Sequence, residues 1–331
     1  MLFFNVMIFS TLISISAYSW FAMWLGLEIN LLSIIPLFKS HKNSYPAEAT
    51  LKYFITQSLA STIILFSIIF SMNLSEFVPQ NFNYWMMMIL NSALLMKLGA
   101  APFHSWFPEV AEGLNWLNNL ILMTWQKLAP SILIMYNMNM MLFFTLIILI
   151  SSIIGGIYGI NQISLRKILA YSSINHIAWM LASMLNNKTI WLIYFMIYSL
   201  ITLNIILIFY LLNIFYINQL TNSMNSNKMM KLLFILNFFS LGGLPPFLGF
   251  LPKWLVINFL LNNNFYILSL ILVIFTLLTL FFYIRITFST LMFKLNENLI
   301  MNIKIYNFNW ILLNILILAG LIVCTLIFNL L

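Results

Sequence analysis

Long apolar runs separated by short polar segments make up almost the whole of the 331-residue chain. An α-helix needs about 20 apolar residues, within a range of about 17 to 25, to cross a bilayer. The pattern therefore predicts eleven membrane-spanning helices, near residues 2–19, 20–38, 49–72, 83–107, 114–137, 139–160, 165–185, 190–217, 229–260, 264–288 and 308–330. The first two are the least clearly separated, because no polar loop lies between them.

Composition gives the class of protein. Hydrophobic residues make up 63% of the chain and charged residues 6%, which excludes a soluble domain because the apolar runs would have no aqueous surface to present. We predict an all-α polytopic membrane protein with a single membrane domain over residues 1–331. The excess of Lys and Arg over acids is explained by loop position and does not indicate a nucleic-acid partner.

The loops between the predicted helices carry an uneven charge. Those on one side hold eight basic residues, Lys39, Lys42, Arg166, Lys167, Lys228, Lys231, Lys294 and Lys304, and those on the other hold only Lys188. By the positive-inside rule, the basic side and the N-terminus face the compartment in which the protein is made. The C-terminus is then expected on the opposite side.

Four ionisable side chains lie inside the apolar runs: Glu28, Lys97, Lys127 and Lys253. A charge near the bilayer centre costs about 2.5 to 3.5 kcal/mol on the insertion scale, and such residues usually mark an ion or proton pathway. Other readings stay open. Any one lysine can extend its ammonium to the headgroups, and Glu28 can pair with a neighbouring subunit for packing alone.

A short motif occurs twice. Residues 99–108 and 243–252 both follow the pattern G-x-x-P-F-x-x-aromatic-x-P. The copies lie on the fourth and ninth predicted helices, and helices five apart run in opposite directions. This indicates an inverted repeat, with halves at 1–137 and 138–288 and an extra C-terminal helix at 308–331. Inverted repeats are typical of transporters.

The prolines of the motif predict helix breaks inside the membrane, because an internal proline removes a backbone donor and clashes with the preceding turn. The candidates are Pro102, Pro245, Pro246 and Pro252. Freed backbone groups need protein or trapped water as partners, so a break marks a polar interior. The alternative is a proline kink that serves packing only.

Several segments resemble the antiporter-like membrane subunits of respiratory complex I, NADH:ubiquinone oxidoreductase: WLGLEINLLSIIP, LLMKLGAAPFHSWFPEVAEG, MTWQKLAP, LRKILAYSSINHIAWM and LGGLPPFLGFLPKW. The resemblance covers essentially the whole chain. It implies a fold of fourteen helices in bacterial members and eleven in some animal members. It also implies the mitochondrial inner membrane, with the N-terminus in the matrix and the C-terminus in the intermembrane space. The bias toward Ile, Phe, Asn and Met fits an AT-rich genome such as an insect mitochondrial one.

The resemblance also implies roles for the four buried charges. Glu28 is the carboxylate that pairs with Lys97 at the first break, Lys127 is the connecting lysine, and Lys253 occupies the terminal position. Burial favours the neutral form of an amine, whereas a nearby carboxylate favours the charged form. A movement of Glu28 would therefore switch Lys97 between holding and releasing a proton. We expect a relay from Glu28 through Lys97 and Lys127 to Lys253.

Other polar residues carry weaker expectations. His104 and His176 are secondary candidates for the relay, since imidazole passes protons near neutral pH; the alternative is a hydrogen-bonded core residue. Glu48 and Lys52, four residues apart at a helix start, are expected to form an interfacial ion pair. Glu109 and Glu112 are expected in a loop. We predict no catalytic residue, no metal site and no bound cofactor in this chain.

The function implied is a core membrane-arm subunit of the proton-translocating NADH:ubiquinone reductase. NADH, FMN, iron–sulfur clusters and ubiquinone are expected in other subunits. Bound phospholipid and neighbouring membrane-arm subunits, one of them antiporter-like, are the expected partners. Two alternatives remain: a free-standing cation/proton antiporter of related fold, and a membrane scaffold whose buried charges only fix helix packing.

Overall fold

A computed structural model describes residues 1–39, 44–74, 80–185, 187–224, 228–292 and Asn314. The described residues form α-helices, with one isolated bridge between Ser164 and Tyr216. The prediction of an all-α fold is confirmed for this part of the chain. The chain divides into two compact units, Met1–Ser151 and Ser152–Leu331.

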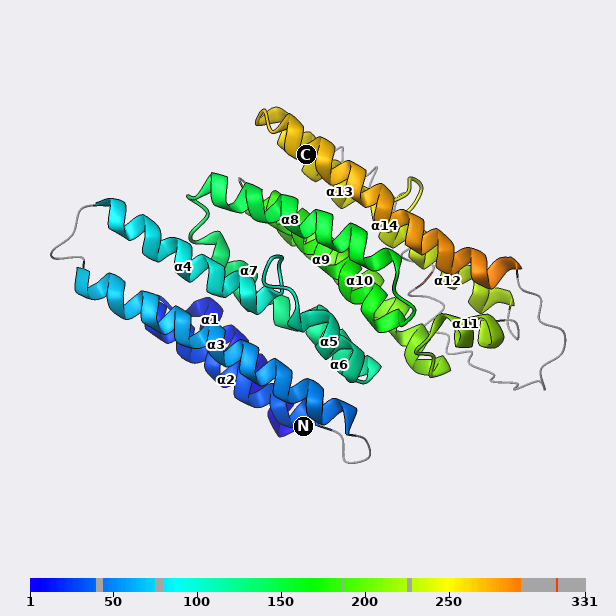
Figure 1. Cartoon of the computed structure of the whole chain (residues 1–331), viewed down its shortest axis with the longest axis horizontal. Helices are drawn as coiled ribbons and strands as arrows, with labels where there is room; N and C mark the ends of the chain where they lie inside the picture. Colours follow the sequence, from blue (N-terminus) through cyan, green and yellow to red (C-terminus); the bar gives the residue numbers. More distant parts are fainter. Residues whose placement is uncertain (40–43, 75–79, 186, 225–227, 293–313, 315–331) are drawn as a thin grey trace. The chain divides into compact units, whose positions relative to one another are not determined.

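The described residues of the first unit form seven complete helices and the start of an eighth, and Figure 1 labels them. They are α1 (Leu2–Ser16), α2 (Trp20–Phe38), α3 (Tyr45–Leu74), α4 (Gln80–Leu98), α5 (Trp106–Gly113), α6 (Trp116–Met123) and α7 (Trp125–Met135). Helix α8 (Met141–Ile160) crosses the division between the units. Within this unit α2 and α4 both pack on α3, and α4 packs on α7.

The second unit holds the remaining described helices: α9 (Leu165–Met184), α10 (Lys188–Leu212), α11 (Ile217–Met224), α12 (Lys228–Gly242), α13 (Phe250–Asn262) and α14 (Tyr266–Met292). Here α12 lies beside α14, and α13 packs on both α9 and α10. The predicted C-terminal helix at 308–330 falls outside the described residues, apart from Asn314.

Helix length and hydropathy fit a membrane protein. Five helices of the described part are long and apolar enough to cross a bilayer: α2, α3, α8, α10 and α14. Large apolar side chains point outward from them; Leu142 on α8 is 78% exposed and Ile267 on α14 is 77% exposed. Such faces are stable in lipid and not in water. The predicted span 229–260 is divided near its middle into α12 and α13, whereas the predicted span 83–107 is interrupted near its end, after α4, and most of α5 lies beyond it.

Helices α1 and α2 form a tightly packed hairpin. A Cβ placed on Gly26 of α2 would lie 2.7 Å from the backbone nitrogen of Ser14 on α1, so only glycine allows this approach. The buried hydroxyls of α1 bond to their own helix: Ser14 Oγ donates to Thr11 O at 2.8 Å. Small residues that satisfy their own polar groups are typical of helix contacts in membranes.

The two main interruptions end their first helix in the same way. Gly99 after α4 has φ +78° and Gly243 at the end of α12 has φ +77°, a conformation that side-chain-bearing residues rarely adopt. The amide of the next residue bonds back five residues in each case, Ala100 N to Leu95 O at 3.1 Å and Leu244 N to Phe239 O at 3.3 Å. Both are Schellman-type ends, in the same register of the repeated motif.

The prolines of the motif differ in position. Pro102 lies between α4 and α5, and Pro245 and Pro246 lie between α12 and α13. Pro252 was expected in a break, but it lies in the first turn of α13. A proline is tolerated there because the amide it lacks would have no partner within the helix. Pro252 therefore fits the start of the helix that follows the break.

A third interruption was not predicted. The span expected at 114–137 is divided at Thr124, whose φ of −113° and ψ of −71° separate α6 from α7. Thr124 Oγ1 donates to Leu120 O at 2.7 Å, and Lys127 N bonds to Thr124 O in a tighter turn. No glycine or proline lies at the interruption itself. Lys127 therefore lies in the first turn of a new helix.

Candidate functional site

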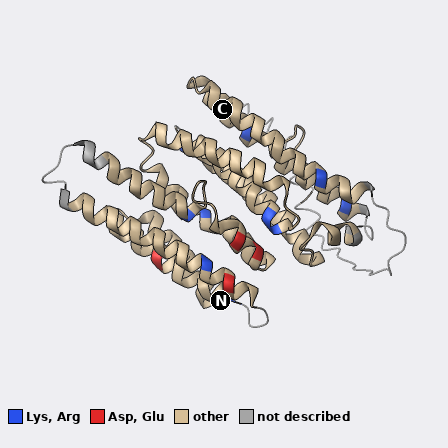
Figure 2. Ribbon diagram, in the orientation of Figure 1, with Lys and Arg blue, Asp and Glu red and all other residues tan. Residues whose placement is uncertain are grey.

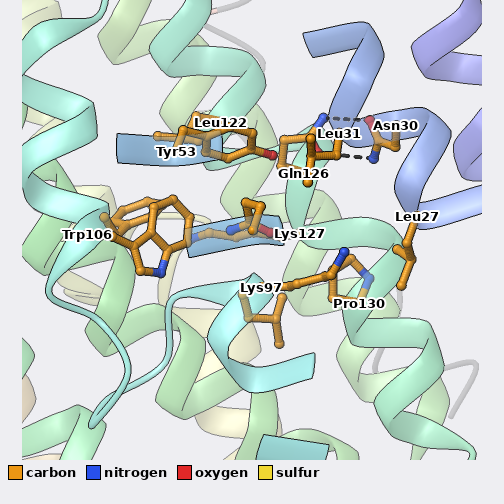
Figure 3. Close-up of a pocket in the computed structure, with 13 residues that line it drawn as sticks. Leu27, Asn30, Leu31, Tyr53, Lys97, Trp106, Leu122, Gln126, Lys127 and Pro130 are labelled. Carbon is orange, nitrogen blue, oxygen red and sulfur yellow. Dashed lines mark hydrogen bonds between the residues drawn. The ribbon is translucent and has the colours of Figure 1, made fainter. Parts of the chain in front are cut away.

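A small polar cavity lies within the first unit, between α2, α3, α4 and α7. Lys97 and Lys127 both line it (Figure 3). The cavity leaves about 20 Å³ for the centres of water molecules, enough to hold about one ordered water. The Lys97 side chain is 7% exposed and Lys127 is 2% exposed. The structure thus places two of the predicted lysines at one internal site.

Helix ends position these two lysines. Lys97 lies in the last turn of α4, just before the helix ends and Gly99 follows. Lys127 lies in the first turn of α7, just after the interruption at Thr124. The partial negative charge at the C-terminal end of a helix favours a cation, so Lys97 is stabilised by its own helix.

Glu28 lies on α2 next to Leu27, which lines the cavity, but Glu28 itself is not among the lining residues. Its residue is partly exposed, but its Oε2 is buried and has no hydrogen-bond partner among the described residues. The carboxylate interacts electrostatically with the ammonium of Lys97. No ion pair within 4.0 Å joins the two side chains in the described part of the chain, so the direct pairing of Glu28 with Lys97 stays a prediction.

Lys127 contacts an aromatic ring. Its Nζ lies 5.6 Å from the centre of the Phe107 ring, within the range of a cation–π contact. Phe107 is 1% exposed and fills the space beside Gly99, where an added Cβ would approach the ring within 3.2 to 3.3 Å. The end of α4 therefore sets the place of the ring that faces Lys127.

We expect Phe107→Leu to impair proton translocation more than Phe144→Leu does. Both changes remove a buried aromatic side chain and cost about 1 kcal/mol or more of packing. Only the first also removes the contact with Lys127, worth about 0.5 to 2 kcal/mol. Proton uptake by membranes that carry each variant, normalised to assembled protein, measures the difference. Equal loss in the two variants would contradict a functional role for the ring.

The second unit holds Lys253 in a different manner. Its Nζ donates to Gly242 O at 2.7 Å and to Leu241 O at 3.3 Å, the carbonyls at the end of α12. The same nitrogen lies 6.0 Å from the centre of the Trp179 ring on α9. Lys253 is 6% exposed. The carbonyls at the end of α12 therefore solvate the ammonium of Lys253.

The two histidines that are secondary candidates for the relay lie in different surroundings. His176 on α9 is buried, its Nδ1 lies 2.9 Å from Tyr194 Oη, and its ring is 5.0 Å from the Tyr198 ring. His104 is half-buried in the first interruption, with Nδ1 3.2 Å from Pro102 O, and it does not line the cavity. The structure brings neither histidine into the group around Lys97.

Other charges have structural partners. Lys52 Nζ lies 3.0 Å from Glu48 and 2.9 Å from Glu109, so the expected pair is present and extends to α5. Glu109 and Glu112 were expected in a loop, but both lie in α5. Arg285 of α14 donates to Gln162 O at 2.9 Å and so binds the segment that follows α8.

Acids are unevenly distributed in the described part of the chain. All four described glutamates belong to the first unit, and the described residues of the second unit contain Lys and Arg but no Asp or Glu (Figure 2).

Within the same described residues, no group of three His, Cys, Asp or Glu side chains is arranged to hold a metal ion.

Sequence reasoning missed three amide side chains of the cavity. Asn30 Nδ2 donates to Gln126 Oε1 at 3.1 Å, and Gln126 Nε2 donates to Asn30 Oδ1 at 3.4 Å (Figure 3). This reciprocal pair joins α2 to α7. Gln57 of α3 also lines the cavity. The sequence offered only a weak signal for these residues. Each is a polar amide in an apolar run, and nothing in the sequence shows which amides lie close together in the fold.

Comparison with known proteins first identifies the class of membrane protein to which this fold belongs. The family described as NADH:quinone oxidoreductase/Mrp antiporter, TM matches residues 17–279. One chain of respiratory complex I from Thermus thermophilus with bound aureothin superposes with a TM-score of 0.87 at 20% identity, over 97% of this chain and 77% of that one. The fold is thus that of the membrane subunits in this class.

More similar proteins narrow the assignment. NADH-ubiquinone oxidoreductase chain 2 of Aedes aegypti is 50% identical over 99% of this chain and 97% of that protein. The Anopheles gambiae protein of the same name is 51% identical over 90% of this chain and 87% of its own length. The chain belongs to the family of NADH-ubiquinone oxidoreductase chain 2 proteins, and it is a multi-pass membrane protein.

Proposed function

We propose that this chain serves proton translocation as a membrane subunit of an NADH:ubiquinone oxidoreductase, and that Glu28, Lys97, Lys127 and Lys253 carry the protons. The observation that supports this most directly is that two buried lysines from different helices line one polar cavity, with a carboxylate acting on one of them. Buried ionisable groups are costly in a membrane and are found where charge must pass.

The chemistry follows from the surroundings of Lys97. With the Glu28 carboxylate close, the ammonium form is favoured; with the carboxylate withdrawn, burial favours the neutral amine and the proton leaves. Lys127, on the same cavity, is the next acceptor, directly or through water. In this proposal Lys253 receives the proton last, and the carbonyls of Leu241 and Gly242 solvate its charge.

The fold itself is proposed to be an inverted repeat. The similar ends of α4 and α12 support halves at 1–137 and 138–288, with eleven membrane spans in all. The N-terminus would then lie in the mitochondrial matrix and the C-terminus in the intermembrane space, as the basic loops indicate. His104 and His176 remain secondary members of the relay.

Electron transfer is proposed to occur in other subunits, which would carry FMN, iron–sulfur clusters and the sites for NADH and ubiquinone. The partners are other membrane-arm subunits, including an antiporter-like neighbour. Phospholipid is expected on the apolar outer faces, where side chains such as Leu142 and Ile267 are exposed. The relatives named as chain 2 favour this function over a free-standing antiporter.

We expect the chain to co-purify in a large membrane complex that oxidises NADH. Membranes are solubilised in mild detergent, separated by size, and each fraction is tested for NADH oxidation and for this chain. Recovery of the chain alone, with cation/proton exchange after reconstitution, would instead identify an antiporter. A scaffold would lose assembly, before activity, when Lys97 or Lys253 is replaced.

A further inference from the structure

One buried side chain of the cavity has an unused hydrogen-bonding group. Gln57 on α3 is 4% exposed, and its Nε2 is buried without a hydrogen-bond partner among the described residues. A buried donor left unpaired costs about 1 to 3 kcal/mol, and buried polar groups that lack protein partners are commonly satisfied by ordered water. The amide of Gln57 therefore points to a ligand.

The neighbours of Gln57 indicate what that ligand is. Lys97, Lys127 and Gln57 line the same cavity, each from a different helix. Three amide side chains line the cavity. Asn30 and Gln126 bond to each other, which leaves the amide of Gln57 to bind a small ligand. Two lysines disfavour a cation, and the cavity has room for water. Water also both donates and accepts hydrogen bonds, as contact with an amide and an ammonium requires.

We propose that Gln57 is a positioning residue that holds a water molecule between Lys97 and Lys127, through which a proton passes. This inference rests on the proposed function. The Lys97 ammonium gives a proton to the water oxygen while the water gives one of its own to the Lys127 amine. The water is regenerated, one positive charge moves from Lys97 to Lys127, and no other reactant is needed.

The chemistry of an amide suits this role. It donates through Nε2 and accepts through Oε1, yet it has no proton to give or take near neutral pH. It can therefore orient water without itself taking up or releasing the transferred proton. A carboxylate at the same place would hold a positive charge beside it, since an opposite charge favours the charged form of an amine.

The test compares Gln57→Leu, which keeps much of the volume and removes the amide, with Ser67→Ala. Ser67 is also a buried polar residue of α3, but its hydroxyl donates to Ile64 O of the same helix at 2.7 Å and it lies outside the cavity. We expect proton translocation in the assembled complex to fall about tenfold to a hundredfold in Gln57→Leu, as for a misplaced reacting group. Ser67→Ala should leave it unchanged, and Gln57→Asn, which keeps the amide, should retain part of it.

A high-resolution cryo-EM map of the whole complex provides a second measurement that does not depend on the variants. Density for water within hydrogen-bonding distance of Gln57 Nε2 supports the proposal. A dry cavity, or density that appears only in chloride buffer, overturns it. This measurement decides the matter if Gln57→Leu fails to assemble.

Variants of the lysines separate the two proposals. If Lys97→Met and Lys127→Met abolish translocation while Gln57→Leu behaves like Ser67→Ala, the inference about Gln57 is wrong and the proposed function stands. If the lysine variants translocate protons normally, the proposed function is wrong, and the inference about Gln57 with it.

Discussion

Lys97→Met is expected to stop proton translocation through this subunit while the complex still assembles. Methionine matches the length and apolar stem of lysine, so packing around the end of α4 is kept. The change also removes a charge from a membrane-buried site, where it is costly. What is lost is the amine that the proposed relay uses as its proton carrier and on which Glu28 acts electrostatically. We expect the transfer step to slow by about 10²- to 10⁴-fold, the range for a positioned acid or base.

The measurement is the number of protons translocated per NADH oxidised in sealed vesicles, with assembly followed by NADH oxidation with an artificial electron acceptor. Lys188→Met is the matched control, because Lys188 is exposed at the start of α10. Glu28→Gln should also lower translocation, since it keeps the shape of the carboxylate and removes its charge. Normal stoichiometry in both Lys97→Met and Glu28→Gln would refute the relay.

Gly243→Ala is expected to damage the second unit far more than Gly242→Ala. Gly243 has φ +77°, which strains an alanine by about 1 to 2 kcal/mol. The new Cβ would also lie 2.7 Å from Lys253 Cδ and 3.0 Å from its Nζ, so the ammonium would leave the carbonyls of α12. Both the stability of the complex and its proton translocation should fall.

The adjacent glycine is a direct control. A Cβ on Gly242 would meet only ordinary contacts, at 3.6 to 3.8 Å on Leu280 and Tyr283. Gly242 ends α12, and an alanine in a helix is favoured over glycine by about 0.5 to 1 kcal/mol. Thermal inactivation of the purified complex should therefore shift down for Gly243→Ala and stay level or shift up for Gly242→Ala. Equal behaviour of the two variants would contradict the packing of Lys253 against Gly243.

The two main interruptions were predictable because glycine and proline act locally. Their effect on backbone angles and hydrogen bonds depends little on the rest of the fold, so Gly99 with Pro102, and Gly243 with Pro245, could be interpreted from the sequence. The burial of the three lysines was predictable for a similar reason, since each lies within an apolar run.

The remaining features depend on contacts between distant segments. No glycine or proline marks the interruption at Thr124 in the sequence. Helix α11 was not predicted either, because it is too short and too polar to resemble a membrane span. The Asn30–Gln126 pair joins residues 96 positions apart. Nothing in a single sequence says that these two amides face each other, or that Gln57 shares their cavity. Pro252 was misplaced because a proline inside an apolar run does not show on which side of it the helix begins.

The carbonyl ligands of Lys253 limit how that lysine can be controlled. A carboxylate such as Glu28 can turn away by a side-chain rotation or lose its charge by taking up a proton. The peptide oxygens of Leu241 and Gly242 can do neither, because they are part of the main chain. To change the field at Lys253, the protein must move the end of α12 itself. In the proposed relay, a side chain would therefore control the first unit, whereas control of Lys253 in the second unit would require a displacement of the end of α12.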